Sequence, residues 1–128
     1  MLVNFDTQVV NYHRISLKEI ESLKDNPIKP KLLLHACCGP CACYPIDWLH
    51  DIFDVTIYYA NSNIYPKSEY VRRKDEMIEK VLPHYPNVNV IIPTYDNALF
   101  TQQLSPYKDE PEKGKRCWLC YELRLKET

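Results

Sequence analysis

Apolar residues along the chain follow two alternating spacings. Three short apolar runs, rich in β-branched, leucine and tyrosine residues, predict buried strands. These runs lie at 31–36, 55–60 and 88–92. Apolar residues at helical spacing predict helices, and these lie at 45–53, about 68–82 and 117–126. Strands that alternate with helices form βαβ units, so we expect an α/β fold with a parallel-sheet βαβαβ core.

Residues 1–30 precede this core and are interpreted as an accessory segment with a short helix. Ser16 is expected to cap that helix, with Glu19 as its capping-box partner. The apolar stripe of the helix is formed by Leu17, Ile20 and Leu23. In the first helix of the core, Pro45 suits the first turn, where a proline costs no helical hydrogen bond. Residues 31–128 are expected to form the α/β domain.

Composition narrows the classes of protein to which the chain can belong. Its 128 residues are 45% hydrophobic and 26% charged, which is typical of one globular domain. Only two glycines are present, which excludes a glycine-rich phosphate loop and a dinucleotide-binding fingerprint. The net charge of −1 gives no overall field that would favour a polyanion, so only a local basic patch could bind one.

No apolar run approaches the roughly 18 residues of a membrane span. The segment Met1–Asp6 lacks the basic and then apolar pattern of a secretory signal. We therefore expect a cytoplasmic protein without a membrane partner. In that reducing compartment, cysteines are more often metal ligands or redox groups than disulfide partners.

Five of the six cysteines fall in two clusters. Cys37, Cys38 and Cys41 directly follow the first predicted strand, and Cys117 and Cys120 lie one helical turn apart in the last predicted helix. Thiolates are the usual ligands of iron–sulfur clusters and are common ligands of zinc. A zinc ion needs only four ligands and would leave one thiol unused. The pattern favours iron and leaves zinc open.

A second interpretation rests on the first cluster alone. Cys38-Gly39-Pro40-Cys41 is a thioredoxin-type dithiol motif between a strand and a helix, where a thiol pKa falls and disulfide exchange is possible. Such an enzyme needs neither Cys37 nor the distant pair. The open alternatives are therefore a thioredoxin-like dithiol oxidoreductase that uses Cys38 and Cys41, and a non-catalytic zinc-binding RNA module.

Polar segments follow the second and third predicted strands, at the carboxyl ends where ligands bind in parallel sheets. Basic residues flank these segments and the second cysteine pair, where they could hold phosphates. They are Lys67, Arg72, Arg73, Lys74, Lys113, Lys115 and Arg116. Aromatic residues near the same ends could stack a base, namely Tyr65, Tyr95 and Trp118. Cys43 lies outside both clusters and is expected to be a small buried apolar residue rather than a ligand.

Three blocks of this sequence resemble the QueH-type epoxyqueuosine reductases, enzymes of the last step of queuosine formation in bacterial tRNA. The first is Leu32-Leu33-Leu34-His35-Ala36-Cys37-Cys38-Gly39-Pro40-Cys41. The second is Asn61-Ser62-Asn63-Ile64-Tyr65-Pro66, which runs into Glu69-Tyr70 and Arg73. The third extends from Glu112 to Leu125 and contains Arg116-Cys117-Trp118-Leu119-Cys120. Together they span nearly all of residues 31–128.

The resemblance implies a Rossmann-type domain like those of the adenine-nucleotide hydrolase and synthetase group (HUP-like). It also implies a [4Fe–4S] cluster with an additional mononuclear iron, shared among Cys37, Cys38, Cys41, Cys117 and Cys120. Members of the family continue past the second cysteine pair, so we expect this chain to be incomplete at its C-terminus.

The implied reaction reduces the epoxide of epoxyqueuosine in a tRNA anticodon loop, with electrons from an unidentified donor. Catalysis is assigned to Cys37, Cys38 and Cys41, together with Tyr65 and Asp96 as candidate proton donors. Tyr95 and His35 are further candidates for proton donation. Substrate binding is assigned to Asn63, Glu69, Tyr70, Arg73 and Arg116.

Overall fold

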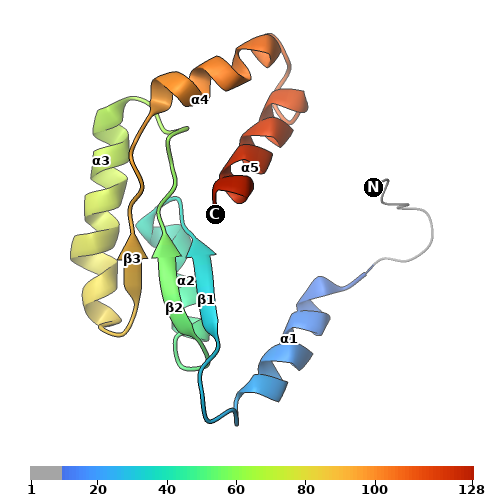
Figure 1. Cartoon of the computed structure of the whole chain (residues 1–128), viewed down its shortest axis with the longest axis vertical. Helices are drawn as coiled ribbons and strands as arrows, with labels where there is room; N and C mark the ends of the chain where they lie inside the picture. The colour runs from blue at the N-terminus through green and yellow to red at the C-terminus, as the bar shows by residue number, and fades with distance from the viewer. Residues whose placement is uncertain (1–9) are drawn as a thin grey trace.

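Three parallel strands form a single sheet in the order β1–β2–β3 (Figure 1). The structure is a computed structural model, and it describes residues 10–128. The strands are β1 (Lys31–His35), β2 (Asp54–Tyr58) and β3 (Asn89–Ile91). In their register Leu34 pairs with Ile57, and Ile57 pairs with Val90. The predicted α/β fold with a parallel sheet is confirmed.

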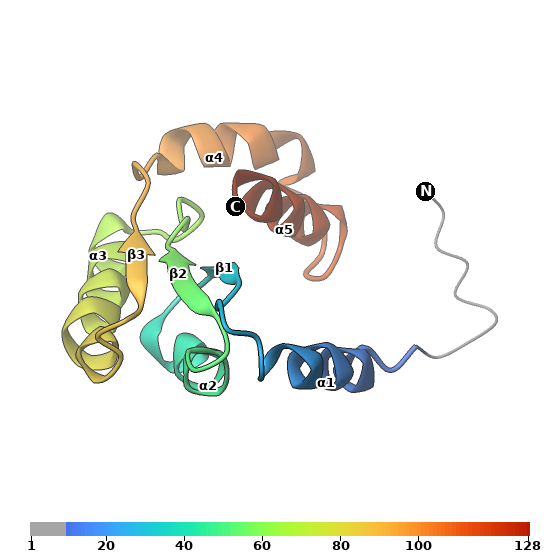
Figure 2. The ribbon, with the colours of Figure 1, turned by 60° about the horizontal axis from the view of Figure 1, so that its bottom comes forward.

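Two helices cover one face of this sheet. They are α2 (Gly39–Leu49) and α3 (Lys67–Glu76), and α3 continues through a π turn at Met77–Val81 and a 3-10 turn at Leu82–His84 (Figure 2). The core between the layers contains Ile46 from α2, Ile57 from β2 and Met77 from the π turn, all with 0% of their surface exposed. Alternate residues of β2 are buried, as expected for a strand that packs on this core.

The accessory helix α1 (Tyr12–Leu23) begins one turn earlier than the sequence predicts. Asn11 caps it, because its side-chain oxygen accepts a hydrogen bond from the backbone N–H of Arg14 at 3.0 Å. Ser16 lies inside the helix, and its hydroxyl donates to the carbonyl of Tyr12 at 2.9 Å. The prediction of a Ser16–Glu19 capping box was therefore wrong, since asparagine is an equally good cap and stands one turn upstream.

The first core helix also begins earlier than predicted. α2 begins at Gly39 and ends at Leu49, whereas the predicted helix began at Pro45 and ended at Phe53. Pro40 occupies its first turn, and Pro45 lies inside the helix. Pro40 and Pro45 would each suit the first turn of a helix, and the helix begins with Pro40 in that turn. The consequence is that Cys38 and Cys41 lie at the beginning of a helix. Cys43 lies on the same helix and is exposed, so the prediction that it is buried was wrong, because it does not share the inward face of Ala42 and Ile46.

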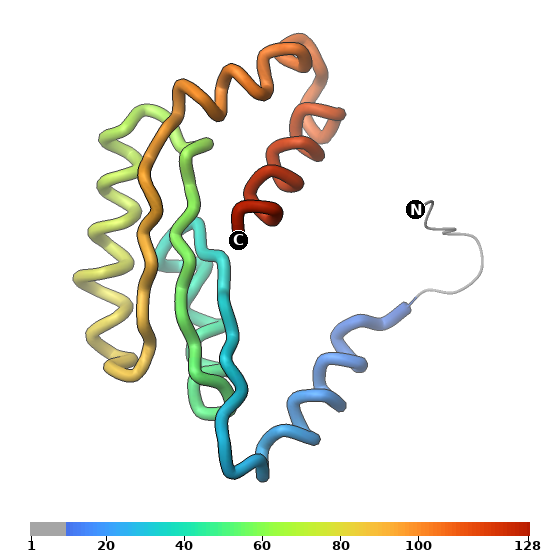
Figure 3. Tube along the Cα trace, viewed as in Figure 1, coloured from blue at the N-terminus to red at the C-terminus, as the bar shows by residue number. Residues whose placement is uncertain are grey.

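Two further helices lie beyond the carboxyl ends of the strands (Figures 1 and 3). α5 (Lys115–Glu127) confirms the predicted helix over 117–126. α4 (Asn97–Leu104) was not predicted, and only Phe100 of its residues is buried. A 3-10 turn at Ser105–Tyr107 leads from α4 towards the loop before α5, and α4 and α5 pack against each other.

Within residues 10–128, no helix combines the length and the apolar character that a membrane span requires. The prediction about Met1–Asp6 lies outside the described residues.

Candidate metal centre and the adjoining pocket

The first cysteine cluster lies where β1 passes into α2. Cys38 has an extended backbone with φ −165° and ψ 167°, and the helix begins at the next residue. The thiol of Cys38 makes no capping hydrogen bond to the helix, so it is available to a ligand. Gly39 permits close packing here, since a Cβ at this position would lie 3.1 Å from Cγ2 of Val81 and that side chain would have to shift. The close approach of α2 to the π turn thus determines where the thiols lie.

The three sulfur atoms of Cys37, Cys38 and Cys41 lie within 4.8 Å of one another. The sulfurs of Cys37 and Cys38 are 3.8 Å apart. Metal–thiolate bonds of about 2.3 Å with tetrahedral angles place two sulfurs about 3.8 Å apart. These residues therefore fit a thiolate-bound metal ion, and they form the only group of three such ligands among the described residues.

The surroundings of the cluster shift the pKa values of Cys38 and Cys41 in opposite directions. Burial opposes ionisation of Cys38, but hydrogen bonds from Cys41 and Cys37 and the positive charge of Arg73 outweigh it and lower its pKa. Hydrogen bonds with Cys38 and Cys37, and the electrostatic coupling to those two thiols, raise the pKa of Cys41 to about 12. Without a metal, one thiolate is thus stabilised by neighbouring thiol donors.

Two hydrogen bonds connect the carboxyl ends of β1 and β2 beneath the cluster. The side-chain amide of Asn61 donates to the carbonyl of Ala36 at 2.6 Å, and Asn61 is 1% exposed. His35 Nε2 lies 2.9 Å from the carbonyl of Ala60, so this nitrogen carries the proton and is engaged. His35 therefore supports the backbone, and its candidacy as a proton donor is not favoured. Asn61 was not assigned a role from sequence, although its place directly after a strand was a signal.

The carboxylate of Glu69, a predicted substrate-binding residue, is hydrogen-bonded to two arginines. Its oxygens accept hydrogen bonds from Arg72 at 2.7 and 2.9 Å and from Arg73 at 2.7 Å. These bonds, that from Arg72 foremost, lower the pKa of Glu69 to about 2. Because Arg73 also contributes to the lowered pKa of Cys38, Glu69 holds a positive charge beside the cysteine cluster.

Tyr70, also predicted to bind substrate, lies in the core with 5% of its surface exposed. Its ring packs between those of Tyr59 at 5.3 Å and Tyr95 at 4.3 Å. The hydroxyl of Tyr95 donates to the carbonyl of Ile64 at 2.6 Å. Both Tyr70 and Tyr95 therefore have packing roles, whereas Tyr65 is 78% exposed and free to contact a ligand.

Asp96, a predicted catalytic residue, is the N-cap of α4. Its side chain accepts a hydrogen bond from the backbone N–H of Leu99 at 3.0 Å. Its own N–H donates to the hydroxyl of Ser62 at 3.0 Å, and the amide of Asn97 donates to the carbonyl of Ser62 at 2.8 Å. The loop after β2 is thus bonded to the start of α4. The position of Asp96 has a structural explanation, and proton donation by it stays a prediction.

The second cysteine pair lies in the first two turns of α5. Lys113, at φ 66°, directs its backbone N–H to the sulfur of Cys117 at 3.3 Å. Gly114 follows it, and a Cβ there would lie 2.8 Å from the carbonyl oxygen of Pro111. Burial raises the pKa of Cys120, while Arg124 acts in the opposite direction. This turn sets the position of the pair.

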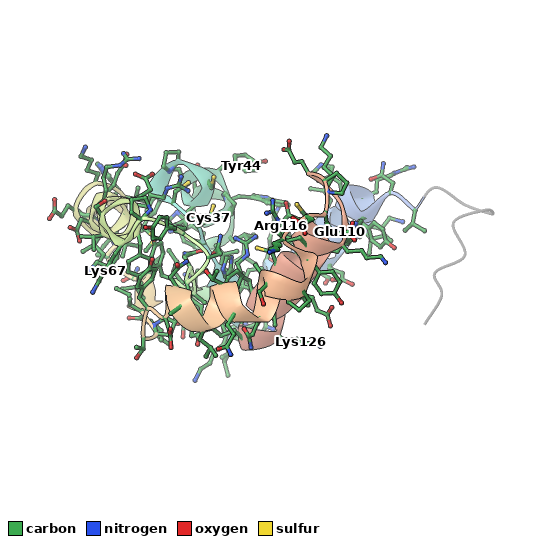
Figure 4. All side chains as sticks on the ribbon, turned by 90° about the horizontal axis from the view of Figure 1, so that it is seen from above. Cys37, Tyr44, Lys67, Glu110, Arg116 and Lys126 are labelled. Atoms are coloured by element: carbon green, nitrogen blue, oxygen red, sulfur yellow. The ribbon has the colours of Figure 1, made fainter. Side chains whose placement is uncertain are left out.

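Cys117 and Cys120 line a pocket of about 780 Å³ formed by the loop after β2, by α4 and by α5. They do not belong to the group of sulfurs that lie within 4.8 Å of one another. Figure 4 labels Cys37, which lies between β1 and α2, and Arg116, which lies on α5. Binding of one cofactor by all five cysteines therefore stays a prediction.

The pocket also contains predicted substrate-binding residues. Asn63 and Arg116 line it, whereas Glu69, Tyr70 and Arg73 do not. Tyr65, a predicted catalytic residue, also lines it. Further lining residues were missed from sequence because α4 was missed, among them Phe100, Thr101, Leu104 and Lys108.

Comparison with known proteins places this arrangement in a family. The family model described as epoxyqueuosine reductase QueH matches residues 32–128. A protein of that name from Staphylococcus aureus is 38% identical over 124 residues, which cover 92% of this chain and 52% of the relative. The protein of that name from Streptococcus pyogenes is 33% identical over 94% of this chain and 49% of its own length.

The chain spans about half the length of these relatives, and the matched region contains both cysteine clusters, the loop after β2 and the pocket. The match covers well over half of the chain, and the sequence resemblance is confirmed. The chain belongs to the epoxyqueuosine reductase QueH family.

Proposed function

We propose that the protein reduces the epoxide of epoxyqueuosine in the anticodon loop of a tRNA, giving queuosine. The observation that carries this proposal is the compact thiol group of Cys37, Cys38 and Cys41, which lies in the region that the family model matches. This group lies at the carboxyl ends of the parallel strands, where proteins with such sheets bind their ligands. The enzyme would work in the reducing cytoplasm, where these thiols stay free.

The proposed cofactor is a [4Fe–4S] cluster with an additional mononuclear iron. Cys37, Cys38 and Cys41 would supply one set of thiolates, and Cys117 and Cys120 the other. When bound, iron supplies the redox and Lewis-acid chemistry that epoxide reduction requires. The N–H of Lys113 supports the sulfur of Cys117, and the charge of Arg73 favours thiolate at Cys38.

The reaction consumes two electrons and two protons. Both carbon–oxygen bonds of the epoxide break, a carbon–carbon double bond forms, and the oxygen leaves as water. The electrons come from a separate donor. For the protons, we propose Tyr65, which is exposed and lines the pocket, and Asp96, which caps the adjacent helix.

The first experiment measures iron, zinc and acid-labile sulfide in protein purified without oxygen, with a visible spectrum. We expect a brown protein with about five iron atoms and about four sulfides per chain, the content of one [4Fe–4S] cluster plus one iron. The same sample is then assayed with tRNA that carries epoxyqueuosine. A colourless sample without iron would contradict the proposal.

A pair of variants tests the ligand assignment. Cys117→Ala is expected to lose the visible absorption and the reduction of epoxyqueuosine together. Cys43→Ala is the matched control, because Cys43 is exposed and lies outside the thiol group. Full absorption and activity in Cys117→Ala would show that Cys117 is not a ligand.

Thiol–disulfide exchange is the second candidate, and the opposed pKa shifts of Cys38 and Cys41 favour it. Iron-free protein would then reduce a model disulfide, and Cys38→Ala would abolish that activity. Stoichiometric zinc in a protein without either activity would instead favour the zinc-binding RNA module.

A further inference from the structure

The pocket between α4 and α5 concentrates positive charge. Lys108, Arg116 and Arg124 line it, and none of the residues that line it is acidic. This is a strong segregation in a chain with 16 basic and 17 acidic residues. Such a pocket favours an anionic ligand.

The rest of the pocket lining is largely apolar and aromatic. Tyr65 comes from the loop after β2, Tyr121 from α5, and Phe100 and Leu104 from α4. The volume of about 780 Å³ lies within the range of sites that enclose a small organic ligand. A free inorganic anion would leave these apolar walls without a partner, so the ligand combines an anionic part with a ring system.

Two buried polar atoms of pocket residues lack a hydrogen-bond partner among the described residues. They are Oδ1 of Asn63 and Nε of Arg124, one acceptor and one donor. The guanidinium of Arg124 lies over the ring of Tyr121 at 5.3 Å, which holds it in the wall of the pocket. Buried polar groups are almost always paired, so both atoms are available to polar atoms of a bound ligand.

We propose that this pocket receives a single nucleotide extruded from a folded RNA. Lys108 and Arg116, both exposed, contact its phosphates, while Asn63 and Arg124 bind polar atoms of its ring system. The aromatic walls stack or pack on that ring. Enzymes that modify a base commonly take it out of the stack into such a pocket. This inference rests on the proposed function and assigns α4, which sequence patterns did not predict, to substrate binding.

A variant that fills the pocket gives the first test. Thr101 is exposed on α4 and lines the pocket, so Thr101→Trp occupies the space of the base. Gln103→Trp is the matched control, since Gln103 is exposed on the same helix and does not line the pocket. The probe is a fluorescein-labelled RNA stem-loop with guanosine in its loop, titrated with protein purified without oxygen.

We expect Thr101→Trp to weaken binding of the stem-loop by about tenfold or more, and Gln103→Trp by less than about twofold. A blunt RNA duplex of equal length should bind the wild-type chain about tenfold more weakly than the stem-loop, because its bases are not extruded. Equal affinity for duplex and stem-loop, or equal effects of the two tryptophans, would overturn the proposal.

The phosphate contacts are tested by charge reversal. Lys108→Glu should weaken stem-loop binding by about tenfold and reduce the slope of log affinity against log salt by about one. Lys18→Glu makes the same change of charge on an exposed face of α1 and should have little effect. Equal losses in the two variants would show that only the overall charge matters.

Binding of the stem-loop requires neither electrons nor reduction, so its outcome is separate from that of the proposed function. Loss of binding in Thr101→Trp together with a wild-type iron content would support the pocket on its own. If the protein lacks iron but binds the stem-loop through this pocket, the reductase proposal fails and the present one stands. Failure of the iron-loaded wild-type chain to bind the stem-loop would overturn the pocket proposal alone.

Discussion

The two cysteine-bearing helices differ in how the fold holds them. α2 carries Cys41 above buried Ala42 and Ile46, and it packs directly on the sheet. α5 carries Cys117 and Cys120 but has no buried residue, and Trp118, Tyr121 and Leu125 on it are more than half exposed. The first group of thiols is therefore positioned by the hydrophobic core, whereas the second is positioned by the turn before its helix and by contact with α4.

This difference indicates how a metal centre could be assembled. Forming the core also forms the first thiol group, because β1 and α2 cannot pack without bringing it together. The second pair lies on a helix that gains little from burial, so binding of a shared metal would contribute a larger fraction of its stability. Metal binding and the placement of α5 are expected to be coupled.

The largest expected difference in unfolding free energy is between substitutions in α2 and in α5. Ile46→Ala removes a fully buried side chain from α2 and should lower the free energy of unfolding by about 2–5 kcal/mol. Leu125→Ala on α5 removes a side chain that is 69% exposed and should change it by less than about 0.5 kcal/mol. Urea unfolding of both variants measures the difference. Similar losses in the two would show that α5 is anchored as firmly as α2.

Glycine substitutions test the turn that holds the second pair. Gly114→Ala would place a Cβ 2.8 Å from a backbone oxygen, and we expect a cost of about 1–3 kcal/mol in unfolding free energy. It should also disturb the bond from Lys113 to Cys117 and reduce iron content. Gly39→Ala is the comparison, because its nearest neighbour is the movable side chain of Val81 at 3.1 Å. A smaller cost at Gly114 than at Gly39 would contradict this view of the turn.

Asp96 links the two regions through the cap of α4. Asp96→Ala should cost about 1 kcal/mol in unfolding free energy, whereas Asp96→Asn should cost little because asparagine caps helices equally well. The asparagine variant also removes the acid while it keeps the cap. Normal stability with lost epoxyqueuosine reduction would assign proton donation to Asp96, and normal reduction would limit it to the cap.

The smallest effect concerns pH. Glu69 has its pKa lowered from 4.5 to about 2 by Arg72 and Arg73, so its contribution to stability is present above pH 4.5 and is lost as pH falls towards 2. Glu69→Gln should remove that acid-dependent part, which acid unfolding monitored by circular dichroism measures. Identical acid unfolding of variant and wild type would show that the arginines do not stabilise the folded state through Glu69.

Sequence patterns located the parts of the site that depend on the core. The first thiol group follows a leucine-rich strand, and parallel sheets place the segments after their strands at one edge, so its position was predictable. The start of α2 was not, because Pro40 and Pro45 both suit a first turn. α4 was missed because Phe100 is its only buried residue, which leaves no apolar stripe to detect. The pocket residues Thr101 and Lys108 were missed with it.

Ser62 forms hydrogen bonds to both Asp96 and Asn97, so substitutions at these positions are expected to depend on one another. Its hydroxyl accepts from the N–H of Asp96, and its carbonyl accepts from the side chain of Asn97. A replacement at position 62 alters a contact to the cap of α4, and a replacement at 97 removes the other contact to the same loop. Substitutions at these positions should therefore be non-additive, and homologues that differ at one of them should tend to differ at the other.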